Sequence, residues 1–178
     1  MNAEESLQAA IHENIELRDY DPAWPSAFSA ERQRLESLLP TVFVGIEHIG
    51  STAVPGLVAK PVIDILAGVK SLCDPPSLIA RVCESGYTTS IEFNRTLIDR
   101  LWFMRWSNGH RTHHLHVVIH GSPSWCEHVR FRDALRKNKF LAARYTVLKM
   151  QLSEKYRSDR EAYTDDKTGF VQAALRDA

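Results

Sequence analysis

Histidines concentrate in one short stretch of the chain, and their spacing is the first sign of chemistry. Five of the eight histidines fall between residues 110 and 120. Residues 114–120 alternate in polarity, which predicts a strand with His114, His116 and His120 on one face. Imidazoles two residues apart suit a transition metal, or a neutral general base beside a phosphate. A polar, half-exposed sheet face is the alternative interpretation.

A single carboxylate interrupts the apolar run of residues 62–69. Burying Asp64 costs free energy unless its carboxylate is paired or bound to a cation. Pairing with Lys60 or with an arginine is one explanation. A role as a metal ligand or a catalytic group is the other, and the sequence leaves both open.

Small and hydroxyl-bearing residues follow another predicted strand. Residues 47–56 read EHIGSTAVPG, so Gly50, Ser51 and Thr52 lie just after the strand and His48 lies within it. Small side chains at such a junction let backbone N–H groups approach a phosphate. An ordinary turn has a similar composition, and this alternative also stays open.

Arginines flank the histidine-rich strand. Arg111 precedes it, and Arg132 and Arg136 follow on a predicted helix. Residues four apart share one helix face, so these two guanidinium groups are expected to converge on an anion. Pairing with nearby acids such as Asp133 is the alternative.

The elements that must position these residues can be predicted from periodicity and from capping and turn residues. Strands are expected at residues 42–49, 62–69, 87–93, 101–105 and 114–120, with helices at 27–39 and 76–85 and three more after Pro123. The predicted fold class is α+β (or α/β), a small mixed sheet flanked by helices. Residues 16–178 are expected to form one domain after a loose lead-in, residues 1–15.

Composition narrows the classes of protein further. The 178 residues are 44% hydrophobic and 25% charged, as in a globular protein with a core. The zero net charge argues against bulk nucleic-acid binding. No apolar run approaches the roughly 18 residues of a membrane span, and no secretory signal begins the chain, so a cytoplasmic location is expected. The three cysteines lack metal-site spacing and are expected to be free thiols.

Several motifs together resemble the GrpB family. They are YDPAWP (20–25), EHIGSTAVPGL (47–57), KPVIDI (60–65), RTHHLHVV (111–118), GSPSW (121–125), FRD (131–133) and YTDDK (163–167). The resemblance covers nearly the whole chain from about residue 16. It implies the nucleotidyltransferase fold superfamily, and members of the family are also found fused to dephospho-coenzyme A kinases.

The resemblance implies roles for individual residues. In that superfamily a Gly-Ser pair holds the nucleotide phosphates, and two acids on the next strand hold a divalent metal. Gly50 and Ser51 match the first element and Asp64 matches the first acid, but Leu66 stands at the second acid position. One carboxylate alone holds Mg²⁺ poorly.

Two accounts follow from this departure. In the first, the chain is an enzyme in which Asp64, His114 and His116 hold zinc, manganese or iron in preference to magnesium, and Asp64 and His116 are catalytic. In the second, it is a nucleotide- or coenzyme-binding module without catalysis. The expected partners are a small phosphate-containing ligand and, through the C-terminal helices, a second copy of the chain. The expected substrate-binding residues are His48, Gly50, Ser51, Thr52, Lys60, Arg111 and Arg132.

Overall fold

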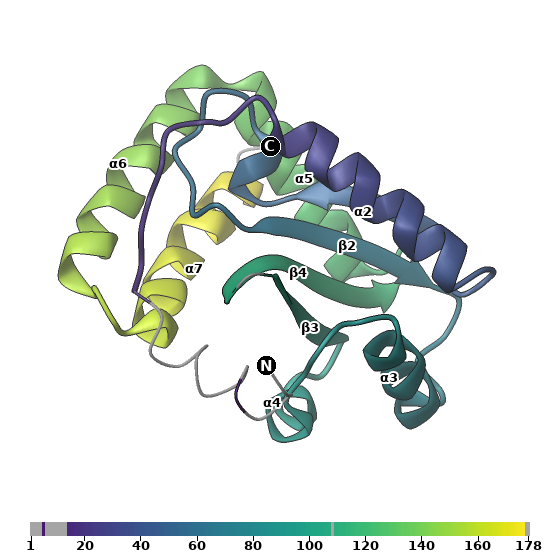
Figure 1. The fold of residues 1–178 in the computed structure, drawn as a ribbon. Helices are drawn as coiled ribbons and strands as arrows, with labels where there is room; N and C mark the ends of the chain where they lie inside the picture. The colour runs from purple at the N-terminus through teal and green to yellow at the C-terminus, as the bar shows by residue number, and fades with distance from the viewer. Residues whose placement is uncertain (1–4, 6–13, 108, 177–178) are drawn as a thin grey trace.

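A four-stranded mixed sheet forms the centre of the protein (Figure 1). The structure is a computed structural model that describes residue 5, residues 14–107 and residues 109–176. Its strands are β1 (Gly45–Ile49), β2 (Ile63–Val69), β3 (Arg100–Ser107) and β4 (His110–Ile119), in the spatial order β1-β2-β4-β3. The central strands β2 and β4 run parallel, and β1 and β3 pair with them antiparallel.

Helices cover both faces of this sheet. Helices α2 (Trp24–Leu38) and α3 (Pro75–Glu84) contribute to the core on one face. Helix α5 (Pro123–Lys137) packs on the other face, and α6 (Lys139–Lys155) and α7 (Arg160–Arg176) pack against it and each other (Figure 1). The short elements are a 3-10 helix, η1 (Ser51–Ala53), and α4 (Ile91–Thr96) beside β3.

Successive side chains along each strand point to opposite faces of the sheet, so the strand residues contribute to two separate cores. Ile65, Phe103 and Leu115 belong to the larger core, beneath α2 and α3. Leu66 and Val118 point the other way and pack with residues of α5. The side-chain period of two then places three polar residues on this second face. They are Asp64, His114 and His116.

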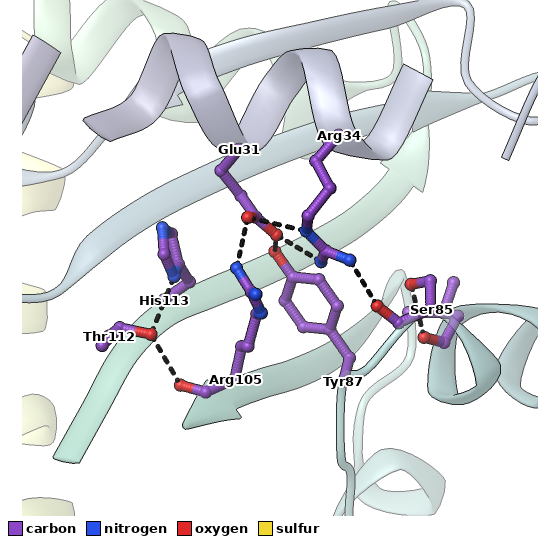
Figure 2. A network of polar contacts seen from close by, with 8 residues as sticks. Glu31, Arg34, Ser85, Tyr87, Arg105, Thr112 and His113 are labelled. Atoms are coloured by element: carbon purple, nitrogen blue, oxygen red, sulfur yellow. Dashed lines mark hydrogen bonds and ion pairs between the residues drawn. The ribbon is translucent and has the colours of Figure 1, made fainter. Parts of the chain in front are cut away.

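A buried ionic network joins α2 to the sheet (Figure 2). The Glu31 carboxylate, 3% exposed, accepts hydrogen bonds from the Tyr87 hydroxyl at 2.8 Å and from Arg34 and Arg105 at 2.5 Å each. Burial by itself would raise the pKa of Glu31, but the bonds from Arg34 and Tyr87 outweigh burial and lower it. The network therefore fixes α2 against β3 and against the segment after α3.

The expected strand at residues 87–93 is wrong beyond its first residues. Thr88 forms only an isolated bridge with Met104, and α4 begins at Ile91. The Ser90 hydroxyl accepts a hydrogen bond from the Phe93 N–H at 3.1 Å and thereby caps that helix. Local capping therefore outweighed the strand-like composition of this segment.

The other differences concern the ends of elements. Helix α2 begins at Trp24 rather than at residue 27, because the Asp21 carboxylate accepts from the Ala23 N–H at 2.8 Å and Pro25 lies in the first turn. Strand β4 begins at His110, so Arg111 lies inside the strand rather than before it. The predicted α+β class, with three helices after the sheet, is confirmed.

The expected lead-in, residues 1–15, falls outside the described residues except at positions 5, 14 and 15. Ile15 is buried with Leu152 and Tyr163, and its N–H donates to the Arg157 carbonyl at 2.9 Å. Across the described part of the chain, no helix has both the length and the apolar character needed to cross a bilayer.

Candidate functional site

Asp64 and His114 form a hydrogen-bonded pair on the two central strands. They are register partners, and Nδ1 of His114 lies 2.9 Å from Oδ1 of Asp64. The carboxylate can only accept, so Nδ1 carries the proton, and Nε2 of the neutral ring keeps a lone pair. That lone pair faces Nη1 of Arg111 at 3.2 Å. Both ring nitrogens of His114 are therefore engaged.

The surroundings of this pair fix its charge. Burial alone would raise the pKa of Asp64, but the hydrogen bond from His114, followed by the electrostatic effects of His114, His116 and Lys60, lowers it to about 2. Burial lowers the pKa of His114, and it lowers that of His116 to about 3. At neutral pH the site therefore holds an ionised carboxylate and two neutral imidazoles.

The Gly50–Ser51 turn lies directly against Asp64. Gly50 has φ +69°, and a Cβ there would lie 2.3 Å from Oδ2 of Asp64. Glycine is required at this position by the backbone conformation and by the close approach. The turn therefore brings Ser51, which is half-buried, next to the carboxylate.

A buried lysine from α6 meets this turn. Nζ of Lys149 donates to Oγ of Ser51 at 3.0 Å and to the Val58 carbonyl, and the residue is 2% exposed. Among the described residues, no carboxylate forms an ion pair with Lys149. Burial lowers the pKa of Lys149 to about 7; the charge of Lys167 acts in the same direction, and Asp64 acts against it.

Two further lysines lie over one aromatic ring from α7. The Tyr163 ring, 1% exposed, has Nζ of Lys167 at 4.0 Å and Nζ of Lys60 at 5.0 Å from its centroid. Burial and the charge of Asp64 raise the pKa of Tyr163 to about 12. We call this constellation the Asp64 cluster. It comprises Gly50, Ser51, Lys60, Asp64, His114, Lys149, Tyr163 and Lys167.

The two arginines of α5 are bound within the protein. Arg132 donates to Glu47 at 2.6 Å and to Asp133 at 2.8 Å. Arg136 donates through Nε to the Ala53 carbonyl at 2.9 Å. The two guanidinium groups therefore hold α5 against β1 and η1, and do not converge on an open anion site in this structure.

His48 and Thr52 also contact each other rather than the Asp64 cluster. Nε2 of His48 lies 3.0 Å from the Thr52 hydroxyl, and the imidazole stacks on Phe28. Burial lowers the pKa of His48 to about 4. His48 also lines a groove of about 610 Å³ with residues from the loop after η1 and from α5 and α6.

The side chains expected to bind a metal are not arranged as a metal centre. Within the described ranges, no three His, Cys, Asp or Glu side chains are placed to hold a metal ion. The facing atoms of Asp64 and His114 are bonded to each other, and the ring centroids of His114 and His116 are 6.5 Å apart. The donor set of Asp64, His114 and His116 therefore does not fit a three-ligand centre.

Leu66 occupies the second acid position as an ordinary core residue. It is 0% exposed and packs with Ile49 and Val118. Its register partner on β1 is Glu47, whose carboxylate accepts from Arg132. Asp64 is therefore the one carboxylate that this part of β2 presents beside the Gly50–Ser51 turn.

Three members of the cluster were given no role from the sequence, although Tyr163 and Lys167 stand in the YTDDK motif. Lys149 on α6 and Tyr163 on α7 come near Asp64 only through helix packing, and Lys167 lies over the Tyr163 ring. One signal was available, since Lys149 is four residues after Tyr145 in the apolar stripe of α6. A lysine in a buried stripe is unusual and is a candidate for function.

Comparisons with known proteins agree on one family. A family model described as GrpB protein matches residues 14–177. The chain is 40% identical over 169 residues to a UPF0157 protein of Pseudomonas aeruginosa, covering 93% of this chain and 68% of that protein. It is 38% identical to the glutamate-rich protein GrpB of Alkalihalophilus pseudofirmus, covering 86% and 90%.

Structure comparison gives a consistent result. The crystal structure of the conserved protein GrpB from Enterococcus faecalis superposes with a TM-score of 0.78 at 32% identity, covering 91% of this chain and 98% of that one. A dephospho-CoA kinase of Mycolicibacterium paratuberculosis is 27% identical over 92% of this chain, which spans 46% of that kinase.

Proposed function

The chain belongs to the GrpB family, and we propose that it is a nucleotidyltransferase-like enzyme whose Asp64 cluster binds a small phosphate-containing substrate. One observation carries this proposal. Lys149 from α6 contacts the Gly-Ser turn beside the ionised Asp64, while Lys60 from the loop before β2 and Lys167 from α7 lie over the Tyr163 ring. Lysine side chains gathered beside a Gly-Ser turn favour an anionic ligand with several charges.

Each part of the cluster has a task in binding. Lys60 and Lys167 are only partly buried, so their side chains are placed to contact phosphate oxygens from solvent. Gly50 has no side chain, which lets the turn pass directly against the Asp64 carboxylate and keeps Ser51 beside that acid. Lys149 holds the Ser51 hydroxyl in place from behind. Because Leu66 leaves Asp64 without a second acid, the lysines neutralise most of the phosphate charge.

The Asp64–His114 pair supplies proton transfer. Asp64 keeps the imidazole in the Nδ1–H tautomer and stabilises the charged ring after it accepts a proton. The substrate phosphate draws Arg111 away from Nε2 of His114, which frees this nitrogen to deprotonate the acceptor group. This step resembles general-base catalysis in other transferases and requires an ionised Asp64.

A binding module is the second candidate. The contact of Arg111 with Nε2 of His114 favours it, because this contact occupies the base that an enzyme needs. One relative is a dephospho-CoA kinase, and its name indicates coenzyme A chemistry in that longer protein. In this account the Asp64 cluster binds a nucleotide or coenzyme without turnover.

Thermal unfolding of the full chain with ATP, dephospho-CoA, coenzyme A or inorganic phosphate tests the binding site. A ligand at 100 times its Kd adds about 2.7 kcal/mol of stability, equivalent to roughly 5–10 °C in Tm for a chain of this size. Lys167→Met should reduce the shift. Lys70→Met, at an exposed position after β2, should leave it unchanged. No shift with any of these phosphates would contradict the proposal.

Product analysis separates the enzyme from the module. The stabilising ligand is incubated with the wild-type chain and with Asp64→Asn, and products are followed by chromatography. The enzyme account expects turnover in the wild type and at least about a 10²-fold loss in Asp64→Asn, the usual range for removing a general-base function. Binding without turnover in the wild type would favour the module.

A further inference from the structure

We propose that Ser51 is a nucleophile and Lys149 its general base, so that a nucleotidyl group is transferred first to Oγ of Ser51. The inference rests on the proposed function for its substrate class, a phosphoanhydride. It goes further because it assigns a covalent intermediate to this chain and a second proton-transfer group besides the Asp64–His114 pair.

The geometry of the two residues is that of a Ser-Lys dyad. Nζ of Lys149 lies 3.0 Å from Oγ of Ser51, within reach for direct proton transfer. The backbone around Ser51 is fixed by η1, where the Val54 N–H donates to the Ser51 carbonyl at 3.1 Å. Ser51 is half-buried and Lys149 is 2% exposed. The nucleophile is therefore partly accessible while its base is shielded from water.

The second contact of Lys149 orients its lone pair. A neutral amine donates through its N–H groups and accepts through one lone pair. The ammonium form donates to both the Val58 carbonyl and Oγ of Ser51. When it loses the proton that faces Ser51, the bond to the Val58 carbonyl remains and the lone pair accepts from the Ser51 hydroxyl. The Tyr145 ring lies 4.9 Å from Nζ and contributes no hydrogen bond to it.

The charged groups around Lys149 allow the neutral amine near neutral pH. Burial, with the charge of Lys167 acting in the same direction and Asp64 acting against it, lowers its pKa to about 7. About half of the amine is then unprotonated at pH 7, a suitable state for a general base. Asp64 comes from β2 and Lys167 from α7, so groups on two other elements contribute to this balance.

The chemical step balances without a further reactant. Oγ of Ser51 attacks the α-phosphorus of the nucleotide, the Oγ–P bond forms, and the P–O bond to the leaving pyrophosphate breaks with its electron pair. The hydroxyl proton passes to Nζ of Lys149 and gives an ammonium group. When an acceptor hydroxyl then attacks the phosphorus, its proton passes to Nε2 of His114, the Oγ–P bond breaks and the ammonium returns its proton to Oγ.

A fluorophosphonate probe tests this assignment on the full chain. Ser51 Oγ would form a bond to phosphorus while fluoride leaves, and peptide mass spectrometry would locate one adduct per chain at Ser51. Ser51→Ala should show no adduct. Lys149→Arg keeps a cation and N–H donors but cannot act as a base, so labelling should fall about 10²-fold. Ser153→Ala, on an exposed turn of α6, is the matched control and should label like the wild type.

The pH profile provides a test that does not depend on the folding of a variant. The labelling rate of the wild type should rise through about pH 7 and then level off, as the amine loses its proton. A rate independent of pH between 5 and 9, or an adduct on another serine, would overturn the assignment. If phosphate ligands still stabilise a chain that fails to label, this inference fails while the proposed binding site stands.

Discussion

Asp64 and His114 are register partners on the parallel strands β2 and β4, with 2.9 Å between Oδ1 and Nδ1. Hydrogen bonding between adjacent strands of the central sheet holds both backbones in place, so the carboxylate and the imidazole meet without a flexible loop. The pair is stable as carboxylate and neutral imidazole. Replacing either residue therefore removes an interaction at the centre of the sheet.

Asp64→Asn should lower the free energy of unfolding at pH 7. Because the pKa of Asp64 falls from 3.8 to about 2 on folding, the ionised form contributes about 2 kcal/mol above pH 4. That contribution is lost as the pH falls from about 4 to 2. Urea unfolding of both proteins at pH 7 and pH 3 measures the difference, which should shrink at pH 3.

The exposed Asp19 provides a control for this prediction. Asp19→Asn should change the free energy of unfolding by less than about 0.5 kcal/mol, as most surface substitutions do. An Asp64→Asn difference that is equally large at pH 3 and pH 7 would show that the lost stability comes from packing rather than from the charge.

Glu31→Gln should be strongly destabilising. The carboxylate is 3% exposed and accepts from Arg34, Tyr87 and Arg105 (Figure 2). Removing its charge leaves two partly buried guanidinium groups without their anion, and breaking a buried pair costs about 3–5 kcal/mol. For a chain of this size the Tm should fall by roughly 6–20 °C. Calorimetry or circular dichroism measures the change.

The same helix carries a matched surface pair. Arg32 donates to Glu36 at 2.8 Å, and both side chains are 49% exposed. Glu36→Gln should cost no more than about 1 kcal/mol, because solvent screens exposed pairs. Equal losses of unfolding free energy in Glu31→Gln and Glu36→Gln would contradict the expected contribution of the buried Glu31 network to stability.

Much of the fold could be predicted because its pattern is local. Residues 62–69 are an apolar run and residues 114–120 alternate, so both central strands could be recognised from the sequence. Helix α4 could not, because a helix of six residues shows less than two turns of periodicity and depends on the Ser90 cap. The ends of α2 and β4 depended on turn contacts and on pairing with a neighbouring strand.

Some residues of the candidate site could be predicted from local sequence patterns, and others could not. Asp64, His114 and the Gly50–Ser51 turn stand out in the sequence because each interrupts a strand pattern or follows one. Lys149 and Lys167 do not, because they reach the site only after α6 and α7 pack across the chain. Helix spacing predicts which residues share a face, but it does not determine which strand that face contacts.

Gly50→Ala should destabilise the protein and disturb the site. The backbone has φ +69°, which costs a non-glycine residue about 1–2 kcal/mol. The added Cβ would also meet Oδ2 of Asp64 at 2.3 Å, so the turn must move. We expect a loss above about 2 kcal/mol, with weaker stabilisation by phosphate ligands, measured by thermal unfolding.

A glycine-to-alanine substitution at Gly169 is the control, because there it should stabilise the protein instead of destabilising it. Gly169 lies within α7, and a Cβ there would meet nothing within 4 Å. Gly169→Ala should stabilise the chain by roughly 0.5–1 kcal/mol, because alanine favours a helix interior. A loss of stability at both positions would show that the constraint at Gly50 is not specific.

Lys149 should make the stability of the wild type rise with pH. Its pKa falls from 10.5 in the unfolded chain to about 7 in the folded one. Between these values the unfolded state binds more protons, so the free energy of unfolding increases with pH by up to about 1.4 kcal/mol per unit. From pH 7 to pH 9 the gain should be about 2 kcal/mol, and this window lies below the raised pKa values of Tyr145 and Tyr163.

Lys149→Met removes the titrating amine while filling a similar volume. The free energy of unfolding of this variant should therefore not rise between pH 7 and pH 9 as it does in the wild type. Lys137→Met, at an exposed position on α5, keeps Lys149 and should follow the wild type. Urea unfolding at pH 7, 8 and 9 compares the three proteins. Parallel curves for the wild type and Lys149→Met would mean that the buried amine stays protonated. Lys149 would then act at Ser51 as a fixed cation, because an ammonium group has no lone pair with which to accept the hydroxyl proton.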